Sequence, residues 1–318
     1  MRELFADLPA DYAAAVFVVM HVAPEAPSIL PDILDRASPL PVIAAQSGAR
    51  VRPGTITVAP PDLHLVLDGD TVRLSRAPRE NRHRPSVDVL FRTAAVAFGR
   101  RVTGVVLSGM LDDGAAGLWA IKRRGGAAVV QDPDDAEYPG MPQSALDVVR
   151  PDYQVPVRAM APILVELARQ PITSRSEPVP DTMASEVRMA LENESSMEQL
   201  DAMGRRVPLT CPECGGSLWE VDNGGPRYRC HVGHAYSMRT LAAEQALHVE
   251  AALWAGLRKL EESERVARRM ASYAREHGDA RAAEYHAESA QNNAAHAQTL
   301  RTLLAEHVDA SGGRASEK

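Results

Sequence analysis

The chain has 318 residues, a formal net charge of −7, 45% hydrophobic residues and 24% charged residues. This composition is typical of an ordinary soluble protein long enough for two domains, and its acidic balance disfavours a nucleic-acid partner, since such binding uses clustered Lys and Arg to neutralise phosphates. No segment approaches the roughly 18 to 20 apolar residues of a membrane span, and the start has no apolar secretory core, so a cytoplasmic location is expected.

The first half of the chain alternates short apolar runs with helical stretches. The predicted elements are buried strands at 14–20, 55–59, 102–107 and 127–130, a hairpin at 64–74 and a helix at 115–124. The strand–turn–helix–strand order from 102 to 130 is a βαβ unit, which requires parallel strands. We therefore expect an α/β fold with an open, doubly wound parallel sheet over residues 1–165.

The second half changes composition several times. Residues 170–180 are rich in Pro, Ser and Thr and lack apolar periodicity, which favours a linker over 166–204. A small Cys/His module is expected at 205–237 and a disordered tail at 311–318. Residues 238–310 lack proline and carry leucines at helical spacing, so two long helices broken near Gly278 are predicted, forming a hairpin or the seam of a homo-oligomer.

The turn at 108–117 is the strongest catalytic signal, because it is rich in glycine and directly follows a predicted buried strand. Functional sites of open α/β sheets form beyond the carboxyl ends of strands. An acidic residue such as Asp113 could orient a histidine here, while backbone N–H groups hold an oxyanion. The alternative is a simple capping turn with an aspartate as N-cap. The turn alone leaves both interpretations open.

Two further segments carry candidate residues. His21 directly follows the first predicted strand, so it could be a general base whose tautomer Asp113 sets, or only a hydrogen-bonded polar residue. The segment 79–84 holds three arginines and a histidine, and Arg82, His83 and Arg84 could recognise the carboxylates of a receptor helix. The alternative is a solvated basic loop ahead of a helix.

Four segments, HVAPEAPS, RENRHRPSVDVLF, GVVLSGMLDDGAAG and QDPDDAEYPGMPQSA, follow one another between residues 21 and 145. In this order they resemble consecutive motifs of the chemotaxis protein-glutamate methylesterase domain. The resemblance implies a Ser/His/Asp hydrolase that needs no cofactor, cleaves glutamyl methyl esters on methylated chemoreceptors and deamidates certain glutamines. It also implies that His21 is the triad histidine, that Asp113 is the triad aspartate, and that Met110 supplies a backbone N–H to the oxyanion hole.

The nucleophile is where the sequence departs from this family. Family members place the serine in a Gly-Ala-Ser-x-Gly-Gly turn after the first strand, and residues 1–20 contain no serine. Either the true protein begins earlier, which the retained His21 and Asp113 favour, or the chain is a catalytically inactive methylesterase-like protein that binds a signalling partner. None of the later serines follows a nucleophile-elbow pattern; those considered are Ser28, Ser86, Ser108 and Ser144.

All three cysteines fall between residues 211 and 230. Cys211 and Cys214 form a C-x2-C pair, and Cys230 and His234 follow as C-x3-H. Thiolates and an imidazole at this spacing are typical of tetrahedral zinc, and because protein atoms fill all four positions the zinc would be structural. The alternative is three reduced structural cysteines. No known role is attached to such a module.

Overall fold

The computed structural model describes residues 1–172, 175–222 and 225–312. Residues 1–241 form one compact unit, and the described chain from Ala242 onward forms a second. Neither the 39-residue helix of the second half nor any other described helix carries an apolar stretch that could cross a lipid bilayer.

The first part of the α/β region builds a three-stranded parallel sheet in the order β1-β3-β2. Its elements are α1 (Arg2–Ala6), β1 (Val16–Val18), α2 (Leu30–Asp35), β2 (Val42–Ala44) and β3 (Ile56–Val58). Apolar side chains of α1, α2 and β3 form one buried cluster, so the short helices are held by packing rather than by their length. An antiparallel hairpin follows, made of β4 (His64–Asp68) and β5 (Thr71–Ser75), as predicted.

The second part builds another three-stranded parallel sheet, in the order β6-β7-β8. Its elements are α3 (Val87–Phe98), η1 (Gly99–Arg101), β6 (Thr103–Val106), α4 (Ala115–Arg123), β7 (Ala127–Gln131), α5 (Gly140–Val148), β8 (Tyr153–Val155), η2 (Val157–Ala159) and α6 (Met160–Arg169). The predicted βαβ unit is confirmed as β6-α4-β7. Helices α3 and α4 cross closely at Gly117, where a Cβ would lie 2.6 Å from that of Phe91.

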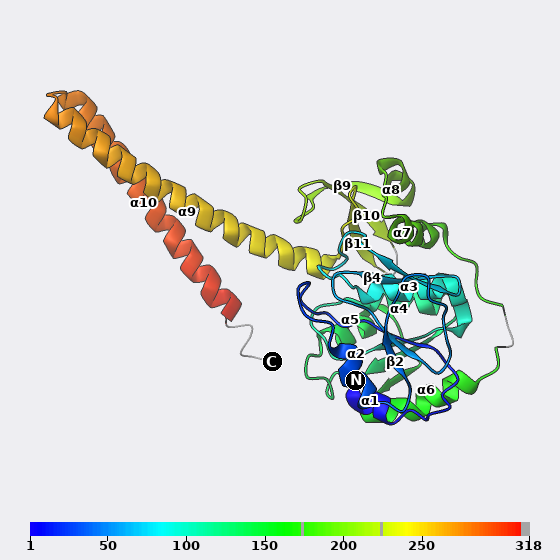
Figure 1. Cartoon of the computed structure of the whole chain (residues 1–318). Helices are drawn as coiled ribbons and strands as arrows, with labels where there is room; N and C mark the ends of the chain where they lie inside the picture. The colour runs from blue at the N-terminus through cyan, green and yellow to red at the C-terminus, as the bar shows by residue number, and fades with distance from the viewer. Residues whose placement is uncertain (173–174, 223–224, 313–318) are drawn as a thin grey trace. The chain divides into compact units, whose positions relative to one another are not determined.

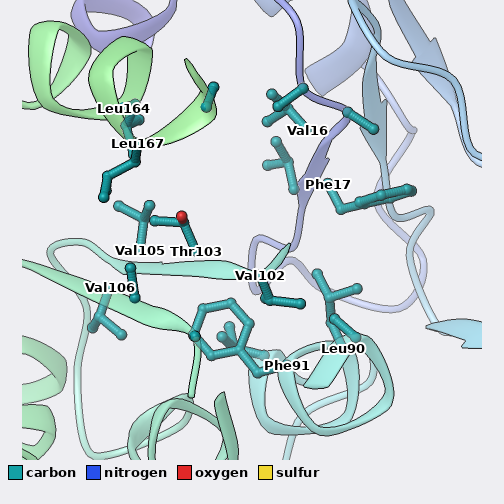
Figure 2. A pocket seen from close by; sticks show the side chains of 18 of the residues that line it. Val16, Phe17, Leu90, Phe91, Val102, Thr103, Val105, Val106, Leu164 and Leu167 are labelled. Atoms are coloured by element: carbon teal, nitrogen blue, oxygen red, sulfur yellow. The ribbon is translucent and has the colours of Figure 1, made fainter. Parts of the chain in front are cut away.

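The parallel strands therefore form two sheets instead of the single open sheet that was expected. The unpaired edge of β1 and the unpaired edge of β6 belong to different sheets, and a cavity of about 1310 Å³ is lined by residues of both strands. Figure 2 shows Val16 and Phe17 on one side and Val102, Thr103 and Val105 on the other. We call this cavity the inter-sheet slot. Its lining is mostly apolar and half-buried.

Part of the predicted linker is helical. Residues 181–203 form α7 (Asp181–Glu192) and α8 (Met197–Met203), and Ser196 closes the start of α8 with a capping box. Met183 is 1% exposed because it packs against residues of α3 and α4. The sequence gives only a weak helical signal here because α7 is polar except for the one face that this packing covers.

The Cys/His module is a four-stranded antiparallel sheet in the order β12-β11-β10-β9. Its strands are β9 (Gly204–Thr210), β10 (Ser217–Asp222), β11 (Pro226–Cys230) and β12 (Ala235–Ser237). Figure 1 shows this sheet beside α7 and α8.

A buried ionic cluster joins the module to the α/β region. Glu80 is 2% exposed and accepts hydrogen bonds from Arg92 of α3 (2.7 Å) and Arg229 of β11 (2.6 Å). Glu186 of α7 accepts from the same Arg229 (2.9 Å), and Arg227 lies 3.2 Å from Glu80. Burial alone would raise the pKa of Glu80, but the charges of the three arginines hold it well below its ordinary value. Opposite charges thus fill an interface that apolar side chains would otherwise occupy.

The second unit is a helical hairpin of α9 (Met238–Glu276) and α10 (Ala280–Gly312), which run side by side in Figure 1. Gly278 has φ +78° between them, so the predicted break is confirmed. Leu257, Ala297 and Leu304 form its buried seam. From residue 313 on, the predicted disordered tail lies outside the described residues.

Removing the charge of Glu80 should destabilise the compact unit strongly. Glu80→Gln leaves three buried arginines with Glu186 as their remaining close carboxylate in the cluster, so we expect the free energy of unfolding to fall by about 3 kcal/mol. Glu220, which pairs with the largely exposed Arg205, is the matched control, and Glu220→Gln should cost no more than about 1 kcal/mol. Urea unfolding followed by tryptophan fluorescence measures both. Equal losses would show that the cluster contributes no more than a surface pair.

Candidate active site

Asp113 lies in the turn between β6 and α4 and is 1% exposed. Its carboxylate accepts hydrogen bonds from the backbone N–H groups of Val87 (2.8 Å) and Asp88 (3.1 Å) and from the Ser86 hydroxyl (2.8 Å). These donors form the N-terminus of α3. Asp113 therefore caps a helix, as the capping interpretation requires, but the helix is α3 and not its own α4.

His21 meets this carboxylate from the end of β1. Its Nε2 lies 2.7 Å from Asp113 Oδ2, and its side chain is 22% exposed, so part of the imidazole is open to the surface. Burial raises the pKa of Asp113, but the hydrogen bond and charge of His21 and the N–H of Val87 outweigh it and place the pKa well below that of an ordinary aspartate. An ionised Asp113 fixes Nε2 as the protonated nitrogen and leaves Nδ1 to accept a proton.

Asp88 completes a reciprocal arrangement between the two helices. It sits in the first turn of α3, yet its Oδ1 accepts hydrogen bonds from Gly114 N (3.0 Å) and Gly117 N (2.6 Å) at the start of α4. Each helix N-terminus is thus capped by an aspartate of the other element. Burial raises the pKa of Asp88 to about 7, against the charge of Arg227, and the nearby charge of Asp113 adds to the rise.

His83 stacks on His21. The two imidazole rings lie 3.6 Å apart between centroids, with 6° between their planes. Burial lowers the pKa of His83 to about 4, and the charge of His21 adds to this effect. His83 is therefore uncharged near neutral pH and packs with its ring face parallel to the His21 ring. Its neighbours in the basic segment differ: Arg84 donates to Asp62 (2.7 Å) and to the carbonyls of Arg76 and Ala77, so its guanidinium is held by the protein.

Met110 lies in the same turn, and its side chain is 69% exposed. Its N–H has no acceptor among the described residues, whereas the preceding Gly109 N–H donates to the Tyr138 carbonyl (2.9 Å). The next residue, Leu111, has φ +61°. A positive φ in a non-glycine residue is strained, and such strain is common where a backbone is shaped to a site. The geometry allows the Met110 N–H to act as an oxyanion donor.

Asn81 is a site residue that the sequence did not single out. Its Nδ2 donates to Asp88 Oδ2 (2.9 Å) and Asp113 Oδ1 (3.4 Å), and its Oδ1 accepts from Ser237 N (3.0 Å) of the Cys/His module. It has φ +49°, in the left-handed region that asparagine tolerates better than most residues. An asparagine among basic residues gives no local sign of these distant contacts.

The four predicted metal ligands come together. Ligand atoms of Cys211, Cys214, Cys230 and His234 all lie within 4.8 Å of one another. His234 Nδ1 faces the thiols of Cys211 (3.7 Å) and Cys230 (3.5 Å), and its Nε2 lies 3.2 Å from Glu213. The contact between Cys211 and Cys230 lowers the pKa of Cys211 and raises the pKa of Cys230, so Cys211 is the thiol that ionises first in the absence of a metal. Three thiols and an oriented imidazole fit a tetrahedral zinc ion.

Comparison with known proteins gives one family. The family model described as CheB methylesterase matches residues 1–164. A protein of Leptospira interrogans is 34% identical over 176 residues, which is 55% of this chain and 91% of the relative. A protein-glutamate methylesterase/protein-glutamine glutaminase of Methanosarcina mazei is 37% identical over 53% of this chain but 48% of its own length, so the chain spans about half of that relative.

One solved structure is also similar. The CheB methylesterase catalytic domain of Thermotoga maritima matches with a TM-score of 0.50 and 31% identity, over 52% of this chain and 90% of that domain. The α/β region therefore shares its fold with this catalytic domain. The Cys/His module and the helical hairpin lie beyond the matched family region.

Stability should depend on pH through Asp113. Because its folded pKa lies below the roughly 3.9 of an unfolded aspartate, its contribution is present above about pH 4 and disappears as pH falls through the folded pKa. We expect Asp113→Asn to be less stable than the unchanged chain by about 3 kcal/mol at pH 7, and this difference should shrink between pH 5 and pH 2. Denaturant unfolding at several pH values measures both curves, in which the carboxylates distant from Asp113 cancel. A difference that does not change with pH would contradict the assignment.

Proposed function

The chain belongs to the CheB methylesterase family, and from this premise we propose that it hydrolyses glutamyl methyl esters on a chemotaxis-type receptor. The name of the Methanosarcina mazei relative includes a glutaminase activity, which supports glutamine deamidation as a second reaction proposed for the same site. The observation that carries the proposal is the 2.7 Å contact between His21 Nε2 and Asp113, at the carboxyl ends of β1 and β6. Ester hydrolysis by a nucleophile, a histidine and an aspartate uses no cofactor.

The residues divide the reaction between them. His21 Nδ1 takes the proton of an attacking hydroxyl, and buried Asp113 stabilises the imidazolium that forms. The Met110 N–H donates to the carbonyl oxygen as it becomes negative. Collapse of the tetrahedral intermediate releases methanol, which takes its proton from His21. Water then repeats the cycle on the acyl-enzyme and releases the glutamate.

Serines near this site are engaged elsewhere. Ser86 Oγ donates to Asp113, Ser144 Oγ donates to the Leu111 carbonyl (3.0 Å), and Ser108 Oγ accepts from Tyr138 N (2.9 Å). None of these hydroxyls points at His21 through a described hydrogen bond. These hydrogen bonds argue against Ser86, Ser108 and Ser144 as the nucleophile.

The inter-sheet slot is the place from which a nucleophile can come. β1 and β6 present unpaired edges to it, and a parallel strand between them would join the two sheets into one. Its carboxyl end would emerge beside His21 and Asp113, because β1 and β6 both end there. We infer that a strand followed by a serine-bearing turn occupies the slot in the active enzyme. At about 1310 Å³ the slot exceeds a usual small-molecule pocket.

The second candidate is a non-catalytic binding protein that uses the same crevice to hold a receptor or signalling partner. The engagement of Ser86, Ser108 and Ser144 favours it. The two candidates differ in what fills the slot: a strand with a nucleophile makes an enzyme, whereas a strand without one makes a binder.

The native protein should therefore be heavier than the 34.4 kDa of this sequence and should release methanol from a methylated receptor. In that active form His21→Gln should lower the rate by about 10³-fold, because it removes the imidazole that Asp113 orients. His296→Gln, on the exposed surface of α10, is the matched control and should retain the full rate. Intact mass spectrometry from native cells and a methanol-release assay test this. A native mass equal to that of the sequence, with no methanol, would leave the binding role.

We also propose that the Cys/His module holds one structural zinc ion at Cys211, Cys214, Cys230 and His234. All four positions are protein atoms, so the ion would stabilise the fold and take no part in ester hydrolysis. The position of Glu213 against His234 Nε2 supports the proposal, because such partners orient a ligating imidazole.

Metal analysis should find about one zinc per chain. His234→Gln should lose it, since a thiolate triad with an amide is a poor zinc site, whereas His231→Gln should keep it because His231 lies outside the ligand cluster. Elemental analysis after dialysis reports the zinc content of each variant. Zinc retained by His234→Gln, or lost by His231→Gln, would mean that the ligand set is different.

A further inference from the structure

The Cys/His module contacts the catalytic turn directly. Ser237, at the end of β12, donates its hydroxyl to Asp112, and Thr240 Oγ1, in the first turn of α9 directly after the module, donates to the other oxygen of the same carboxylate (2.7 Å). Asp112 is the neighbour of Asp113 in the chain. Ser237 of the module is therefore hydrogen-bonded to the turn that carries Asp113.

Asn81 makes the second connection, and it reaches Asp113 itself. Its backbone N–H donates to the Ala235 carbonyl (2.8 Å), its Oδ1 accepts from Ser237 N, and its Nδ2 donates to Asp88 and Asp113. Both hydrogen-bonding ends of one buried amide are thus used, one toward the module and one toward the carboxylates. Asn81 is 2% exposed, so solvent cannot replace a lost contact without cost.

The metal ligands lie next to these contacts in the sequence. Ala235 directly follows His234, and the Cys230 N–H donates to the His234 carbonyl (2.9 Å) within the same tight loop. An ion that binds both Cys230 and His234 would fix the loop from Cys230 to His234. This loop in turn positions the Ala235 carbonyl and the Ser237 N–H, which are the two groups that bond to Asn81.

We propose that Asn81 is a positioning residue through which metal binding in the Cys/His module sets the orientation of Asp113 and hence of His21. The module then contributes to the geometry of the esterase site. Loss of its metal would weaken the contact between His21 and Asp113, although neither residue is a metal ligand. The inference rests on the proposed function for its biological meaning, but the contacts that carry it do not require turnover.

A competing route also joins the module to the site. Arg229 donates to the Gly233 carbonyl (3.0 Å) in the metal loop and to Glu80, which lies next to Asn81 in the chain. Coupling through the ionic cluster would bypass the Asn81 amide. The experiment must therefore remove that amide alone.

Asn81→Gly does this, because glycine accepts φ +49° without strain and deletes only the side chain. Asn193→Gly is the matched control: Asn193 also has a left-handed backbone, at φ +59°, and its amide accepts a hydrogen bond from Ser75, far along the chain from the metal ligands. Both substitutions are made in the full chain.

The first readout is the NMR resonance of the His21 ring proton held by Asp113, assigned by its loss in His21→Gln. Zinc removal with a chelator should shift or broaden it in the unchanged chain and in Asn193→Gly, and should have at most a small effect in Asn81→Gly. A signal that ignores zinc in the unchanged chain would overturn the proposal. So would an equal zinc effect in Asn81→Gly, which would assign the coupling to Arg229 and Glu80.

The second readout covers the case in which zinc removal unfolds the module. Coupling is reciprocal, so Asn81→Gly should weaken zinc affinity by about fivefold or more, while Asn193→Gly should not. Competition with a chromophoric chelator gives both affinities. Equal affinities, or a chain that binds no zinc, would refute the proposal. Absence of methanol release would refute only the esterase function, because neither readout depends on it.

Discussion

The α/β region depends on one buried negative charge, which brings several of its loops and helix ends together. The carboxylate of Asp113 is removed from water and must be satisfied by donors from the protein alone. Its donors come from the end of β1, the loop before α3 and the start of α3: His21, Asn81, Ser86, Val87 and Asp88. Segments far apart in the chain can satisfy it only if they meet at one point. The same requirement that fixes the fold there also fixes the base.

Some residues of this site could be predicted from the sequence and others could not. Glycines after an apolar run indicated the turn that holds Asp113, and the C-x2-C and C-x3-H spacings indicated the three cysteines and the histidine that lie together, because these signals are local. The stacking of His83 on His21 and the role of Asn81 could not be predicted, since they depend on how distant loops meet. The split of the sheet was missed because periodicity identifies strands but not the neighbour that each strand receives.

Burial of charge was not predicted. The basic segment suggested a surface for carboxylates, which stays a prediction for Arg82, His83 and Arg84, whereas Glu80 within the segment is buried against arginines of α3 and β11. Arg227 and Arg229 are two residues apart on β11 and so share one face, which is a pattern that a solvent-exposed edge strand would also show. Only the acidic residues brought from α7 and from the loop at Glu80 decide that this face is interior. Burial of charge is a tertiary property, and composition does not report it.

The open edges of β1 and β6 also bear on how the molecule behaves in concentrated solution. An unpaired strand edge beside apolar side chains is a template for another chain, and two such edges border the same slot. Molecules in which these two edges stay unpaired would associate edge to edge, and the tendency would grow with concentration. The strand proposed for the slot would therefore also keep molecules of this protein apart.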